Sequence, residues 1–257
     1  MSSNGRKRVG LALGGGVGRG LAHIGVLSVL ERAGIPIDCV SGTSAGSIVG
    51  AVYCVGWSLD RIREEARRIH WRQLASPVWP SRGLVSFDKL ERWLVDKLGD
   101  ISFAELKIPY AAAATDLRTF EPVTLREGRL APAVRASCSF PGLVTPIELD
   151  GRLLCDGFVS NSVPVSAVRA MGADYVIGVD ILAPAVRSRW GALGYAVVGF
   201  EIMAQKAGQG YQTADCLISP DLAGVSYLRL DYERLMALGE RAAEEKLPGI
   251  LTALRGA

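Results

Sequence analysis

Short apolar runs alternate with stretches of helical spacing in the first part of the chain. Residues 9–13 are apolar and are followed by three glycines, which predicts a buried strand that ends in a tight turn. Residues 21–33 carry apolar side chains at helical intervals, 35–41 predict a second strand, and 45–54 predict a helix of small residues. Strand, turn, helix, strand, turn and helix in this order indicate a parallel sheet with helical crossovers.

The same alternation continues to the end of the chain. Strands are predicted at 110–115, 151–155, 175–179 and 216–219, with a helix at 130–137 and mostly helical character from residue 187 onward. We therefore predict an α/β fold of three layers, α/β/α, with a central, largely parallel sheet. No internal repeat or low-complexity linker divides the chain. The predicted organisation is one domain over residues 8–220 and a helical extension over 221–257 that packs on it.

Residues 58–98 differ in character, because they combine a basic helix, a loop rich in proline and tryptophan, and a second amphipathic helix. Four of the five tryptophans lie in or beside this segment: Trp57, Trp71, Trp79 and Trp93. Aromatic rings with arginines can lie in the headgroup region of a membrane. A pair of cap helices packed on the core by their aromatics gives the same pattern. Weaker binding to anionic vesicles after replacement of Trp79 and Arg82 would favour the membrane interpretation.

Composition narrows the classes of function. Hydrophobic residues make up 49% of the 257 and charged residues 21%, so the chain can bury a core without metals or disulfides. The basic and acidic residues are nearly balanced, with a net charge of +3, which does not indicate nucleic acid as the main partner. Five scattered cysteines, none in a CxxC pair, fit reduced thiols in the cytoplasm. We find no signal peptide and no run long enough to span a membrane, so any membrane contact is expected to be peripheral.

Gly42-Thr43-Ser44-Ala45-Gly46 fits the pattern G-x-S-x-G, between a predicted strand and a predicted helix. A nucleophile on such a turn needs small neighbours, here Gly42 and Gly46, because the backbone bends sharply. The following helix directs N–H groups and partial positive charge toward the reacting centre. A serine that merely caps a helix would give the same string.

A glycine run, residues 14–20, separates the first predicted strand from its helix. Acyl transfer develops negative charge on a carbonyl oxygen, and free main-chain N–H groups in such a run can stabilise it. The run lacks the spacing of a dinucleotide or P-loop motif, although a plain tight turn remains possible. Arg19 is a candidate for binding substrate phosphate, with a structural ion pair as the alternative.

Histidine is scarce, which limits the groups that could activate Ser44. His23 lies on the buried side of a helix and His70 ends the basic helix, so neither occupies the late loop of a Ser-Asp-His triad. Asp156 ends an apolar strand and is followed by Gly157, which permits close approach. A partly desolvated aspartate has a raised pKa and is a better proton acceptor. An ordinary turn aspartate is the alternative.

Five ordered motifs resemble those of the patatin-like phospholipases, most of all the bacterial branch related to neuropathy target esterase. They are LALGGGVGRGLAHIGVL from Leu11, GTSAG from Gly42, AATDL from Ala113, RASCSFPG from Arg135 and DGFVSNSVPV from Asp156. The resemblance covers residues 8–180. It implies a Ser44–Asp156 dyad, an oxyanion hole around Gly15, Gly16 and Gly18, a lipid acyl-ester substrate, and no metal or other cofactor.

Two positions depart from the family pattern. Val17 replaces a further glycine, and it can supply an N–H in the same way if its φ is negative. Phe158 replaces the usual Gly or Ala and is expected to narrow the mouth of the site, where it would contact substrate. These departures keep a non-catalytic scaffold protein as the alternative, and an acyltransferase is a second one. The sequence leaves the oligomeric state open.

Overall fold

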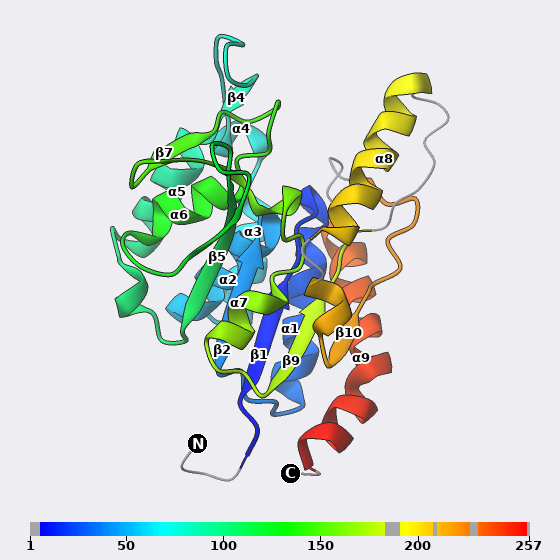
Figure 1. Cartoon of the computed structure of the whole chain (residues 1–257). Helices are drawn as coiled ribbons and strands as arrows, with labels where there is room; N and C mark the ends of the chain where they lie inside the picture. The colour runs from blue at the N-terminus through cyan, green and yellow to red at the C-terminus, as the bar shows by residue number, and fades with distance from the viewer. Residues whose placement is uncertain (1–5, 183–190, 208–209, 227–230, 256–257) are drawn as a thin grey trace.

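The computed structural model describes residues 6–182, 191–207, 210–226 and 231–255 (Figure 1). Its main sheet has eight strands in the order β10-β9-β1-β2-β5-β8-β7, with β6 also paired to β5. Five strands run parallel: β1 (Val9–Leu13), β2 (Cys39–Thr43), β5 (Tyr110–Asp116), β9 (Tyr175–Val179) and β10 (Cys216–Ile218). Three strands at one side are antiparallel: β6 (Pro122–Leu125), β7 (Ile147–Leu149) and β8 (Arg152–Asp156).

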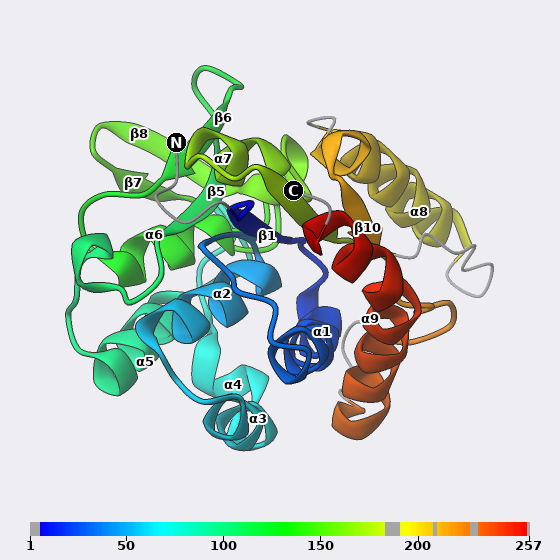
Figure 2. The same ribbon diagram turned by 90° about the horizontal axis from the view of Figure 1, so that it is seen from below.

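Helices cover both faces of this sheet (Figure 2). One face carries α1 (Leu21–Arg32), α2 (Ala45–Val55), α6 (Leu130–Ser137) and, outside them, α3 (Leu59–Arg68), α4 (Trp71–Leu74), α5 (Asp88–Leu98) and α9 (Tyr232–Arg255). The other face carries α7 (Val165–Ala170), while α8 (Gly191–Lys206) stands at the side of β10. The short 3-10 turns are η1 (Val17–Gly20), η2 (Phe103–Glu105), η3 (Gly157–Val159) and η5 (Gly210–Thr213). The predicted three-layer α/β/α fold with a largely parallel sheet is confirmed.

The sequence pattern located the parallel strands better than the antiparallel ones. β1 and β9 have the predicted bounds, but β2 begins at Cys39 and not at residue 35. Asp38 is the reason, because its N–H donates to the Val9 carbonyl at 2.8 Å while its carboxylate accepts the Val9 N–H at 2.7 Å. The antiparallel strands β6 and β7 are short and half exposed, so no continuous apolar run marks them.

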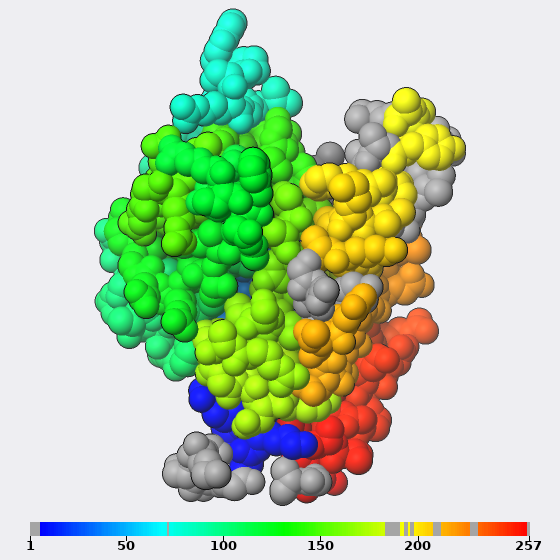
Figure 3. Space-filling view, viewed as in Figure 1, coloured from blue at the N-terminus to red at the C-terminus, as the bar shows by residue number. Residues whose placement is uncertain are grey.

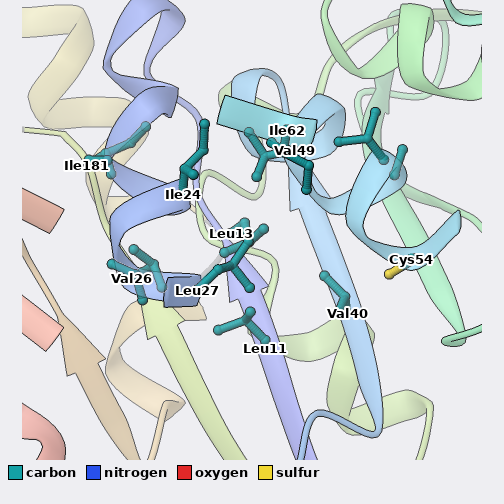
Figure 4. Packing of buried hydrophobic residues seen from close by; sticks show 14 of the residues in the cluster. Leu11, Leu13, Ile24, Val26, Leu27, Val40, Val49, Cys54, Ile62 and Ile181 are labelled. Carbon is teal, nitrogen blue, oxygen red and sulfur yellow. The ribbon is translucent and has the colours of Figure 1, made fainter. Parts of the chain in front are cut away.

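The core lies between β1 and the helices α1 and α2. Every residue of β1 is buried, and Leu11 and Leu13 face Ile24 and Leu27 of α1 (Figure 4). Each such side chain contributes about 1.5–3 kcal/mol on burial. The burial of β1 explains its unbroken apolar sequence.

The C-terminal helix α9 lies against α1 at a crossing made of glycines. A Cβ added to Gly239 would lie 2.0 Å from the Ala22 carbonyl oxygen, and one on Gly25 would lie 2.0 Å from that of Met236. Only glycine allows the two backbones to approach this closely. Helix α9, which lies within residues 221–257, thus packs directly against α1. None of the helices in the described ranges is both long and apolar enough to cross a bilayer.

The tryptophans of residues 58–98 fall into two environments. Trp57 is buried and meets Trp93 edge to face with ring centroids 6.3 Å apart, while the Arg61 guanidinium lies 4.0 Å from the Trp57 ring centroid. Trp79 is 85% exposed in the hairpin of β3 (Ser76–Pro77) and β4 (Val85–Ser86). The side chain of Trp71 lies outside the described part. Trp57 and Trp93 therefore pack on the core, and Trp79 alone of these three tryptophans is largely exposed.

Candidate active site

Ser44 forms a sharp turn between β2 and α2. Its φ of 52° and ψ of −121° are unusual for a residue with a side chain, and such a conformation costs about 1–3 kcal/mol. The helix holds this turn, because the Ser44 carbonyl accepts the N–H of Ser47 at 2.8 Å and its hydroxyl at 2.7 Å. The half-buried side chain of Ser44 stands where the sheet meets the N-terminus of α2.

The flanking glycines are required by close contacts. A Cβ on Gly42 would lie 2.4 Å from the Gly46 carbonyl oxygen, and one on Gly46 would lie 2.3 Å from the Leu13 carbonyl oxygen. Real Cβ atoms do not come so close to backbone. The sequence predicts that the turn needs small residues at Gly42 and Gly46, and these close contacts give the geometric reason.

Ser137, at the end of α6, holds the turn from outside. Its hydroxyl oxygen accepts the N–H of Ser44 at 3.0 Å. No pattern of neighbouring residues predicts this bond. The position of Ser137 in the RASCSFPG motif is the one signal that could have suggested a role, since a backbone partner far away in the chain leaves no local pattern.

Strand register brings Asp156 to Ser44. Thr43 of β2 pairs with Ala113 of β5, and Ala114 of β5 pairs with Asp156 of β8. Ser44 and Asp156 therefore stand on either side of the same end of β5. The Thr43 hydroxyl adds a direct tie, because it donates to the carbonyl of Asn161, five residues after Asp156, at 2.9 Å.

The carboxyl group of Asp156 is buried, with 1% of the residue exposed. Oδ1 accepts the N–H of Phe158 at 2.9 Å. Burial raises the pKa of Asp156 to about 7, against a smaller lowering by the Phe158 N–H and the Ser44 hydroxyl. The Ser44 hydroxyl is therefore near the carboxyl, although no hydrogen bond joins the two groups. Oδ2 of Asp156 has no hydrogen-bond partner among the described residues.

The glycine run lies directly beside Ser44. A Cβ on Gly15 would lie 3.3 Å from the Ser44 Cβ. The Gly15 N–H, however, donates to the Ser162 carbonyl at 3.1 Å, which corrects the expectation that Gly15 supplies a free donor. The next N–H groups, of residues 16–18, donate to no described residue because they open the η1 turn, and they include the predicted Gly16 and Gly18.

Val17 departs from the expected backbone conformation. Its φ is +51°, so the condition under which Val17 would supply an N–H as a glycine does, a negative φ, is not met. A β-branched residue is strained in this region, at a cost of about 1–3 kcal/mol. The structure thus explains why a glycine is the usual residue at this position, and Val17 remains 40% exposed beside the site.

His23 contacts the glycine run through a hydrogen bond to its first residue. The residue is fully buried, and its Nε2 lies 2.8 Å from the carbonyl oxygen of Gly14. Burial lowers the pKa of His23 to about 4, so the imidazole is neutral at ordinary pH. A carbonyl only accepts, so Nε2 carries the proton and donates it. His23 therefore helps to hold the loop.

The structure does not bring Arg19 into this group. Its side chain is buried at 1% exposure and Nη2 donates to the Val225 carbonyl at 2.8 Å, so the guanidinium takes part in interior packing.

Phe158 is close to the site but also buried. Its ring lies 6.0 Å from that of Phe140 and stacks at 5.8 Å on Phe200 of α8.

Comparisons with known proteins find a matching family and several relatives of this chain. The family described as Patatin-like phospholipase matches residues 11–169. An uncharacterized NTE family protein of Mycobacterium tuberculosis is 37% identical over 177 residues, which are 68% of this chain and 49% of that protein. Lysophospholipase NTE1 of Saccharomyces cerevisiae is 34% identical over 179 residues, 67% of this chain and 11% of that protein. This chain spans half or less of the length of these relatives.

Solved structures show the same fold at low sequence identity. VipD of Legionella pneumophila has a TM-score of 0.56 at 14% identity, covering 97% of this chain and 69% of that chain. Human GIVD cytosolic phospholipase A2, solved with a fluorophosphonate inhibitor, has a TM-score of 0.50 at 14% identity, covering 99% and 60%.

Proposed function

We propose that this chain, which belongs to the patatin-like phospholipase family, hydrolyses acyl esters of lipids with Ser44 as nucleophile and Asp156 as base. The observation that carries the proposal is the strained Ser44 turn beside a buried carboxyl whose pKa is raised to about 7. A base with a pKa near the working pH combines a usable ionised fraction with affinity for the proton. An ordinary surface aspartate would be a far weaker acceptor.

The proposed reaction has two half-reactions. The Asp156 carboxylate takes the proton of Ser44 Oγ as Oγ bonds to the ester carbonyl carbon, and the resulting oxyanion accepts hydrogen bonds from the N–H groups of Gly16 and Gly18. Collapse of this intermediate breaks the ester C–O bond, and the leaving alkoxide takes the proton from Asp156. Water then attacks the acyl-enzyme carbonyl carbon while Asp156 accepts its proton; the bond from that carbon to Ser44 Oγ breaks, Asp156 returns the proton to Oγ, and the fatty acid leaves.

A serine-directed fluorophosphonate probe tests the nucleophile. We expect it to label the wild-type protein but not Ser44→Ala, and to label Ser219→Ala, which removes an exposed hydroxyl after β10. Equal labelling of Ser44→Ala and wild type would refute the proposal, and absent labelling of all three would favour a scaffold protein. Product analysis with an added lysolipid or alcohol separates hydrolysis from acyl transfer.

We further propose that the protein meets lipid with the carboxyl edge of its parallel strands. Two structures project from that edge in Figures 1 and 3, the β3–β4 hairpin and α8. Trp79 in the hairpin is 85% exposed, and α8 exposes Tyr195 and Met203. Exposed aromatic and apolar side chains on either side of a site suit insertion at a lipid surface.

Vesicle binding tests this surface. The double variant Trp79→Ala/Arg82→Gln should bind anionic phospholipid vesicles more weakly than wild type. Arg241→Gln is the matched charge control, since Arg241 is an exposed arginine on α9 that is ion-paired to Glu245, as Arg82 is to Glu148. Unchanged binding of the double variant, or an equal loss in the control, would overturn this surface.

A further inference from the structure

An apolar groove begins beside Ser44 and runs between the helices of one face. Its lining includes Val17, Gly18 and Ala45, the residue directly after Ser44. The cavity has a volume of about 130 Å³. The groove therefore reaches residues that adjoin the proposed nucleophile and the oxyanion donors.

One face of α2 forms the length of the groove. Ala45, Ile48, Val49 and Val52 repeat at the spacing of a single helix face, and they line it in that order. From Ala45 to Val52 the helix rises about 10 Å. Ile24 of α1 and Ile62 of α3 stand opposite, and Figure 4 shows them grouped with Val49.

Two aromatic rings line the groove beyond the C-terminal end of α2. Trp57 follows the end of α2 and meets Trp93 of α5 edge to face, and both line the groove. Among the lining residues that the structure describes, Glu65 alone carries a charge, and its carboxylate is paired with Lys97 Nζ at 2.9 Å. The groove thus offers an apolar channel without an unpaired charge, so its ligand must be apolar too.

We infer that this groove binds the acyl chain of the substrate and limits the length that it can bury. The inference rests on the proposed function, because it places the ester carbonyl at Ser44 with its oxygen toward Gly16 and Gly18. An apolar cavity of about 150 Å³ holds one benzene ring, so about 130 Å³ accommodates roughly six carbon atoms. Carbons beyond that number must leave the groove for solvent or for the lipid surface.

A series of p-nitrophenyl esters from acetate to palmitate tests the limit. Each additional buried methylene is expected to raise kcat/KM by about fourfold. The rise should end near the hexanoate or octanoate, after which longer chains gain little. A steady rise to palmitate, or no dependence on length, would overturn the proposed limit.

Two substitutions in the groove should move the limit in opposite directions. Ala66→Phe on α3 fills the channel and should lower the ratio of hexanoate to acetate kcat/KM by about tenfold or more, the loss of two or three buried methylenes. Trp93→Leu replaces one of the lining rings by a smaller side chain, so kcat/KM should continue to rise up to longer esters. Ala253→Phe makes the same change as the first at a partly buried position on α9, and it should keep the wild-type ratio.

The outcomes separate this inference from the proposed function. If Ser44→Ala abolishes turnover of every ester but Ala66→Phe and Trp93→Leu leave the length profile unchanged, the hydrolase stands and the groove has no part in acyl binding. If Ser44→Ala turns over the esters as fast as wild type, the proposed function fails first. A folded variant is verified by its thermal unfolding curve, so a changed ratio cannot come from loss of protein.

Discussion

Replacement of Asp156 by asparagine should make the protein inactive and, at neutral pH, more stable. The change keeps the shape of the side chain and removes its ionisation. Burial raises the pKa of this carboxyl from 3.8 to about 7, so the folded protein holds a proton that the unfolded chain releases between these values. An ionised Asp156 in the interior therefore lowers the free energy of unfolding of wild type. The asparagine variant has no ionised group at this position and avoids that loss.

The size of this cost follows from the shift. Below about pH 4 the carboxyl is protonated in both states and contributes nothing. Between about pH 4 and pH 7 the free energy of unfolding of wild type falls by about 1.4 kcal/mol per pH unit, and above pH 7 the loss is constant at about 4 kcal/mol. Asp180, whose pKa burial also raises, titrates in wild type and variant alike, so its effect cancels in their difference.

Urea unfolding of both proteins at about pH 4.5 and pH 8 measures this difference. The stability of Asp156→Asn relative to wild type should increase by about 3 kcal/mol from the lower to the higher pH. In parallel, kcat/KM of wild type for p-nitrophenyl butyrate should rise tenfold per pH unit and level off above about pH 7, and the variant should lose about 10²–10⁴-fold.

Two results would refute the reasoning. A stability difference that is the same at both pH values would show that the Asp156 carboxyl titrates normally in the folded protein. An activity profile with its midpoint near pH 4 would show that a normal carboxylate is the base. Either result removes the buried, high-pKa aspartate from the mechanism.

Gly15→Ala places a Cβ 3.3 Å from that of Ser44, so kcat of the esterase assay should fall by about tenfold or more; an unchanged kcat would mean that the loop can move aside. His23→Gln should lower the stability by about 1 kcal/mol through the weakened bond to Gly14, while the midpoint of the pH–activity profile stays near 7 because neutral His23 does not titrate there. A moved midpoint would instead make His23 part of the proton pathway. Val17→Gly should raise the stability by about 1 kcal/mol, since relief of the positive φ exceeds the entropy cost of glycine, and a lower melting temperature would contradict the strain.

The sequence by itself determined the parallel part of the fold and the turn at Ser44. These features depend on contiguous residues: β1 is apolar because both of its faces are buried, and Gly42 and Gly46 mark a sharp bend within five residues. The sequence also predicts Asp156 as the base, from an apolar strand followed by glycine and from the absence of a suitably placed histidine. Such signals are local, so they survive without knowledge of the remaining chain.

Only the tertiary structure decided how these residues meet. The strand register across β5 places Asp156 near Ser44. The Gly15 N–H donates a hydrogen bond to the Ser162 carbonyl, and the Arg19 side chain is buried in the interior. The groove likewise exists only where α1, α2, α3 and α5 converge. A hydrogen-bond partner, a buried charge and the volume of a cavity are set by atoms far apart in the chain, and no pattern of neighbouring residues specifies them.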